Sequence, residues 1–209
     1  MKKTILLMSM AIALFAGDIA GEYVVISVES NGKKEASFME VGFSKDGNLM
    51  IMGMPAGKWT CDKSKQIVSI ESVFDTNGAE ENKIVKQSDN LLVLKSKSAT
   101  TTYRKLDNTK IEKENKTAPF LGGWKVLSSA DNKVTLSFTL PNIFIYEKID
   151  TKENSTENVK GKWIYDKKDH SIIVMTIGSP FAGENKILKT EDNSLELSNK
   201  TNRFKLIKQ

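Results

Sequence analysis

Gly57-Lys58-Trp59 opens a stretch, Gly57 to Lys63, that the chain repeats with few changes from Gly161 to Lys167. The later stretch Glu81-Asn82-Lys83-Ile84 has the same relation to Glu184-Asn185-Lys186-Ile187. Matching positions lie roughly 100 residues apart in both cases, and a constant separation of this kind indicates a duplicated structural unit.

The two copies also begin and end alike. Gly21-Glu22-Tyr23 corresponds to Gly122-Gly123-Trp124 at the start. At the end, an alignment on the aromatic residue matches Tyr103-Arg104-Lys105-Leu106 with Phe204-Lys205-Leu206-Ile207. The chain is therefore divided into a first unit at 21–106, a linker at 107–120 and a second unit at 121–209.

Each unit is predicted to be all β. Short segments rich in β-branched and aromatic residues alternate with turn formers such as Asp46-Gly47 and Asn77-Gly78, which is typical of antiparallel strands joined by hairpins. Beyond the N-terminal segment the chain has no extended helical period, apart from one possible turn at 179–183. Eight strands per unit favour a closed up-and-down barrel, because closure leaves no free strand edge.

Two other architectures fit the same strands: an open sandwich per unit, or one larger barrel built from both copies. The segment between the copies contains Lys110-Ile111-Glu112-Lys113-Glu114-Asn115-Lys116, which is polar and charged. Such a composition is typical of a linker. It favours two tandem small antiparallel eight-stranded barrels.

The N-terminus has the features of an export signal. Lys2 and Lys3 precede an apolar run from Thr4 to Ala16, and small residues come after it. This run is too short to span a membrane as a helix, so residues 1–20 are predicted to be a cleaved signal peptide. We expect an exported protein, periplasmic or secreted, with no transmembrane segment in the mature chain.

The repeated features resemble bacterial lipocalin-like domains of the calycin group. The resemblance is carried by the Gly-x-aromatic start, the Phe43-to-Gly47 hairpin, the mid-domain Gly-Lys-Trp-x-x-Asp and the aromatic-basic last strand. It implies a binding fold in which the first-strand aromatic packs under a basic residue of the last strand. Its structural signature would be Tyr23, Trp59, Trp124 and Trp163, with Arg104 or Lys105 over Tyr23 and Arg203 or Lys205 over Trp124.

Composition excludes several classes of protein. Cys61 is the single cysteine, so no intrachain disulfide forms. Lysines and acids are interspersed along the chain despite a net charge of +5, and nucleic-acid binding would need a clustered basic face. His170 is the single histidine, and no nucleophile or phosphate-binding motif occurs. We therefore expect no catalytic residues, no cofactor and no enzyme activity.

Residues that differ between the copies are the better candidates for ligand binding. Met50, Met52 and Met54 are expected to alternate along one strand and to share one face. In the corresponding region the second copy has Phe144 and Tyr146. Thioether groups suit either an adaptable apolar surface or a Cu(I) ion.

The residues support three hypotheses for the function. The first is a non-enzymatic binding protein that holds a small apolar or amphipathic ligand in a barrel mouth, the usual site for such folds. The second is an interaction module with filled barrels that binds a cell-envelope protein. The third is Cu(I) binding through the methionine strand.

Overall fold

The computed structural model describes residues 19–74, 78–127 and 132–209. The predicted signal peptide lies outside these residues except for Ile19 and Ala20, and Asn77 of one predicted turn also lies outside them. Ile19 belongs to the core of the first unit, where it is 2% exposed.

The first unit forms a closed antiparallel barrel of eight strands, because β1 pairs with both β3 and β9. The short β2 is an additional strand that pairs with the end of β1. The strands are β1 (Gly21–Ser30), β2 (Lys33–Glu35), β3 (Glu40–Phe43), β4 (Asn48–Ile51), β5 (Met54–Asp62), β6 (Ile67–Ser72), β7 (Glu80–Ser88), β8 (Leu91–Lys95) and β9 (Thr100–Lys105).

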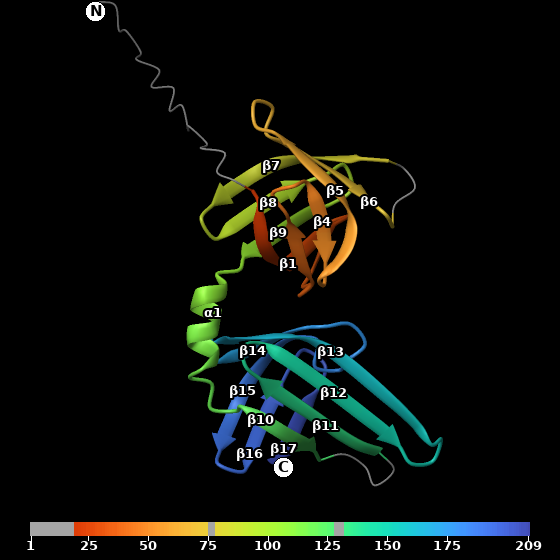
Figure 1. The fold of residues 1–209 in the computed structure, drawn as a ribbon, viewed down its shortest axis with the longest axis vertical. Coiled ribbons are helices and arrows are strands. Elements are labelled where there is room, and N and C mark those ends of the chain that lie inside the picture. The colour runs from red at the N-terminus through yellow and green to blue at the C-terminus, as the bar shows by residue number, and fades with distance from the viewer. Residues whose placement is uncertain (1–18, 75–77, 128–131) are drawn as a thin grey trace, which may run out of the picture.

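The second unit forms a closed barrel of eight strands in the same order, with β10 paired to β17. The strands are β10 (Gly122–Val126), β11 (Asn132–Thr139), β12 (Ile143–Asp150), β13 (Ser155–Asp166), β14 (Ser171–Met175), β15 (Gly183–Glu191), β16 (Ser194–Ser198) and β17 (Arg203–Lys208). Figure 1 shows the two barrels stacked one on the other. The prediction of two tandem all-β barrels is confirmed.

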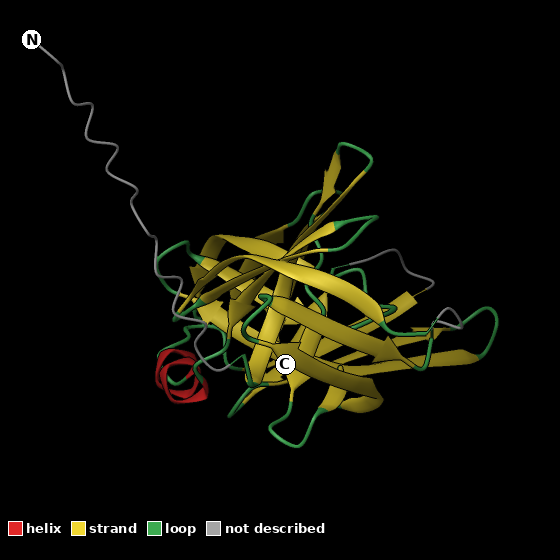
Figure 2. Cartoon of the chain, turned by 90° about the horizontal axis from the view of Figure 1, so that it is seen from above, coloured by secondary structure: helices red, strands yellow, loops and turns green. Residues whose placement is uncertain are grey.

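The segment predicted to be a linker contains a helix, α1 (Asn108–Asn115), which lies at one side of the stacked barrels (Figure 2). Asp107 caps this helix by accepting a hydrogen bond from the Lys110 N–H. Ile111 is the one apolar residue of α1, so the sequence shows no helical period and gives little sign of the helix. Its stability comes from packing on the barrels. Within the described residues, no helix is long and apolar enough to span a membrane.

The Gly-Lys-Trp motif has the same structural role in both barrels. The indole N–H of Trp59 donates to the Ser44 carbonyl at 2.9 Å, and that of Trp163 donates to the Thr139 carbonyl at 3.0 Å. Each carbonyl lies at the hairpin turn opposite its tryptophan. A Cβ atom on the motif's glycine would lie 1.9 Å from a carbonyl oxygen of β6 in the first barrel, and 2.5 Å from one of β14 in the second. The glycine therefore lets neighbouring strands approach closely.

The first-strand aromatics are also equivalent. The hydroxyl of Tyr23 and the indole N–H of Trp124 each donate to the carbonyl four residues earlier, at 2.8 and 2.7 Å. Lys105 lies 5.8 Å above the Tyr23 ring, and Lys208 lies 4.6 Å above the Trp124 ring. The basic-over-aromatic pairing expected from the resemblance is therefore present in both barrels.

For the basic residue over Trp124, the predicted residues, Arg203 or Lys205, were wrong. Lys208 covers Trp124, whereas Arg203 binds the Glu196 carboxylate at 2.8 Å. The alignment of Tyr103 with Phe204 is wrong by two residues. Tyr103 pairs with Val25 on β1, and the equivalent residue of the second barrel, Leu206, pairs with Val126 on β10. A two-residue shift keeps the same face of the strand inward, so the hydrophobic pattern did not reveal it.

Candidate functional site

The two aromatic residues expected to bind a ligand in the second barrel belong to its packed core. Phe144 and Tyr146 are 0% and 3% exposed. They pack near Phe181, which stacks on Phe204 with ring centroids 4.0 Å apart. These rings fill the barrel interior, which an eight-stranded barrel leaves just wide enough for side chains.

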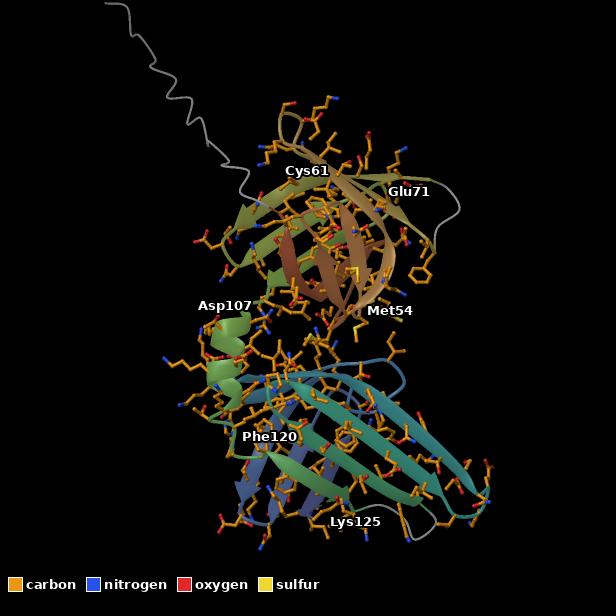
Figure 3. The ribbon with its side chains drawn as sticks, viewed as in Figure 1. Met54, Cys61, Glu71, Asp107, Phe120 and Lys125 are labelled. Carbon is orange, nitrogen blue, oxygen red and sulfur yellow. The ribbon has the colours of Figure 1, made fainter. Side chains whose placement is uncertain are left out.

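The three methionines do not share one strand face, so that prediction was wrong. Met50 lies on β4, Met52 lies in the turn after it with a φ of 51°, and Met54 begins β5. Figure 3 shows Met54 at the end of the first barrel nearest the second, where it is 59% exposed. The turn removes the geometric basis for a Cu(I) site on one strand. Among the described residues, no group of three or more His, Cys, Asp or Glu side chains is placed to hold a metal ion.

An apolar contact joins the two barrels. Val24 on β1, Ile111 on α1 and three residues of β13 and β14 form one buried cluster, separate from the two barrel cores. These three residues are Ile164, Ile173 and Met175. All five are 7% exposed or less. The outward faces of the two barrels are therefore buried against each other at this junction.

The positions that form this junction are polar in the opposite copy. Strand register makes Lys125 the counterpart of Val24, because Val24 and Lys125 each come directly after the first-strand aromatic. It likewise matches the three apolar residues of β13 and β14 with Thr60, Ser69 and Glu71. Figure 3 shows two of these polar counterparts, Glu71 and Lys125, on sides of the barrels that face away from the junction. At these positions each copy therefore has apolar residues only on the face that it contributes to the junction, and the equivalent face of the other copy is polar.

Two ion pairs cross the junction. The Lys162 ammonium of β13 lies 2.5 Å from the Glu40 carboxylate of β3, whose side chain is 6% exposed. Arg104 of β9 lies 3.3 Å from Asp166 at the end of β13. Arg104, expected from the resemblance to cover Tyr23, is therefore a junction residue. Both pairs therefore join side chains of different barrels.

A cleft of 480 Å³ lies beside the Glu40–Lys162 pair. Its apolar lining comes from the first barrel and its N-terminal segment, chiefly Met50 and Ala20. Gly42 lies across from Met50 on β3, and the absence of a side chain there deepens the cleft. The volume is within the range of about 300–1,000 Å³ typical of small-molecule sites. Of the predicted ligand-binding residues, Met50 is the one that lines this cleft.

Charged groups at the cleft are held by neighbouring polar groups. Glu22 accepts a hydrogen bond from the Asn108 side-chain amide at 2.8 Å. Asp46, in the adjacent hairpin turn, accepts from the Ser44 hydroxyl and from the Asn48 amide. The Ser44 hydroxyl is the main reason that the pKa of Asp46 is lowered from its ordinary value.

Two further clefts border the same junction. One of 840 Å³ lies beside α1 and is lined by charges of both signs, including Asp89, Lys110 and Asp169. The other, of 410 Å³, lies where Phe38 of the first barrel approaches Gly183 of the second. Of the three, the 480 Å³ cleft beside the Glu40–Lys162 pair has the most apolar lining. It is therefore the strongest candidate for a small organic ligand.

Sequence reasoning missed Glu40, Lys45 and the whole junction. The available signal was the difference between copies at outward-facing strand positions, such as Val24 against Lys125. An apolar residue at such a position indicates that something covers it.

Fold and cleft together define a class: a tandem pair of small β-barrels with a ligand-sized cleft where they meet. No protein-family model matches the chain, and no curated protein matches it in sequence.

Proposed function

We propose that this protein is an exported, non-enzymatic binding protein, and that it holds a small apolar or amphipathic ligand in the cleft between its barrels. The observation that carries the proposal is the 480 Å³ cleft, whose apolar floor is bordered by the Glu40–Lys162 pair. An apolar surface with a few convergent polar groups is the usual composition of a ligand site.

The filled interior of the second barrel supports a site outside the barrels. Among the described residues, eight aromatic side chains belong to its core, against four in the core of the first. The lipocalin-like architecture supports a role in binding, and here the second barrel adds Lys162 to a cleft that is lined mainly by the first.

A second candidate is an interaction module for a cell-envelope protein. It is favoured by Val73 and Phe74 after β6, which are 69% and 75% exposed. These two exposed apolar side chains are neighbours in the sequence, and a larger apolar patch around them would mark a site for a partner.

Native mass spectrometry of the protein purified from its own host tests the first candidate. We expect a co-purifying small molecule in the natural chain and its loss in a Met50→Trp variant, because the indole fills the cleft. The control is Ile145→Trp, at the matching position of the second barrel and away from the cleft. Equal ligand occupancy in the natural chain and in Met50→Trp would rule out the cleft.

A further inference from the structure

We infer that the ligand of the cleft is a single-chain amphiphile with an anionic head group, a carboxylate or a phosphate, bound by Lys162 and Lys45. This inference rests on the proposed function and adds the charge of the ligand. Its basis is the way in which the acids and lysines at the cleft are already paired.

Each acid near the cleft already has donors from the protein. Glu40 is paired with Lys162, and Glu22 accepts from Asn108. Asp46 uses both carboxylate oxygens within its own turn, accepting from Ser44 and Asn48. The negative charge of each of these acids is therefore already partly compensated by a donor of the protein.

The lysines, in contrast, have donors to spare. An ammonium group has three N–H donors, and the contact with Glu40 uses one of those of Lys162. Lys45 is exposed and has no ion pair or hydrogen-bonded side-chain partner among the described residues. Both lysines therefore keep N–H donors that an anionic group in the cleft can use without displacing a protein contact.

The two copies explain why Lys162 faces the cleft. Its counterpart Lys58 lies across from Glu71 on the neighbouring strand, and its ammonium binds the Asn48 side chain at 2.5 Å. Lys162 instead lies across from the buried Met175, so its own barrel offers no carboxylate at that position. Its side chain is 39% exposed, so its ammonium group can be reached from the solvent.

The apolar lining of the cleft indicates what the apolar part of the ligand is. Ala20 and Met50 offer a surface for an alkyl chain beside the two lysines. Gly42, which lies opposite Met50, leaves the floor of the cleft uncovered. The missing side chain at Gly42, opposite Met50, leaves a gap about one side chain wide, and we therefore propose a single alkyl chain for this part of the ligand.

The test measures binding of four twelve-carbon probes, dodecanoate, dodecyl phosphate, dodecanol and dodecylamine, by isothermal titration calorimetry, below their solubility limits and micelle concentrations. The chain used keeps Ile19 and Ala20, because both belong to the first barrel and Ala20 lines the cleft. We expect at least one anionic probe to bind at least tenfold more tightly than the alcohol. Lys45→Gln, which breaks no protein contact among the described residues, should reduce that advantage several-fold without weakening the alcohol. Lys162→Gln should also reduce the advantage, and the double variant Glu40→Gln/Lys162→Gln should do so without leaving a buried carboxylate unpaired. Lys58→Gln is the matched control and should leave all four affinities unchanged.

Other outcomes separate the two proposals. Equal binding of acid and alcohol, or tighter binding of the amine, would overturn the anionic head group while leaving the cleft as a ligand site. An equal loss in Lys58→Gln would show that overall charge, and not the cleft lysines, is responsible. Failure of every probe to bind, with no co-purifying ligand in the natural chain, would reject the cleft site itself.

Discussion

The three residues of the Gly-Lys-Trp motif have three separate tasks. The tryptophan fills the barrel and ties down a hairpin turn through its indole N–H. The glycine lets two strands approach, since a Cβ would contact a backbone oxygen. The lysine points outward and differs in its partner, an asparagine in the first barrel and Glu40 in the second. The motif therefore recurs for reasons of folding, and its lysine alone was free to take on a different role.

The glycine's task predicts a cost for Gly161→Ala. The added methyl would lie 2.5 Å from the Met175 carbonyl oxygen, so the strands must move apart, at a cost of about 1–3 kcal/mol. Urea unfolding followed by tryptophan fluorescence measures this loss. Gly123→Ala is the control, because the nearest atoms there belong to the flexible Gln209 side chain. Equal midpoints for both variants would contradict the close-approach argument.

Tyr103 predicts a weakness at high pH. Burial raises the pKa of Tyr103 to about 12, while the unfolded chain has the ordinary value near 10. The folded state then holds its proton more tightly, so the contribution to stability is present below pH 10 and is lost between pH 10 and pH 12.

Thermal unfolding at a series of pH values checks this expectation. The natural chain should lose stability more steeply than Tyr103→Phe between pH 10 and pH 12, because phenylalanine has no proton to lose. Parallel curves would show that other groups dominate the alkaline limb.

At the scale of elements, α1 and residues 116–120 are a docked part of the second barrel. Asn115, 0% exposed, donates to the Pro141 carbonyl at 2.8 Å and accepts from the Tyr165 N–H at 2.9 Å. Ala118 and Phe120 continue into the barrel core. A short polar helix of low intrinsic stability is therefore fixed by one buried amide and by two apolar side chains beyond its C-terminus.

Asn115→Ala is expected to release this helix. The change leaves the buried Tyr165 N–H without its acceptor, at a cost of about 1–3 kcal/mol. Hydrogen exchange should then be faster across 108–115, while the strands of the first barrel keep their protection. Asn108→Ala, which removes an exposed hydrogen bond, is the control. Unchanged exchange in the Asn115 variant would mean that the barrels hold the helix without it.

At the scale of the whole molecule, the junction makes two barrels into one unit. Apolar residues lie at its centre and the ion pairs Glu40–Lys162 and Arg104–Asp166 lie around it. Because the junction uses different faces of the two barrels, the matching faces on the outside are polar, as Glu71 and Lys125 show.

Val24→Lys introduces at the junction the residue that the second copy has at that position. A lysine there would be buried against Ile164 and Ile173, so the barrels should separate rather than bury the charge. We expect a larger radius of gyration by small-angle X-ray scattering, faster proteolysis between residues 107 and 120, and an unchanged far-UV circular dichroism spectrum. Lys125→Val is the control and should change none of these. A compact Val24→Lys variant would show that the junction tolerates the charge.

The sequence by itself determined the duplication, the barrel strands and the core tryptophans, because periodic hydrophobicity and turn residues act locally and appear twice. It also pointed to Met50, although for a different reason. The tertiary structure alone decided that Phe144 and Tyr146 fill a core, that a turn separates Met50 from Met54, and that Lys208 covers Trp124. It alone brought Glu40 and Lys162 together to form a cleft. The physical reason is that this cleft depends on outward-facing side chains of two separate barrels, and no pattern within one strand records which outer faces meet.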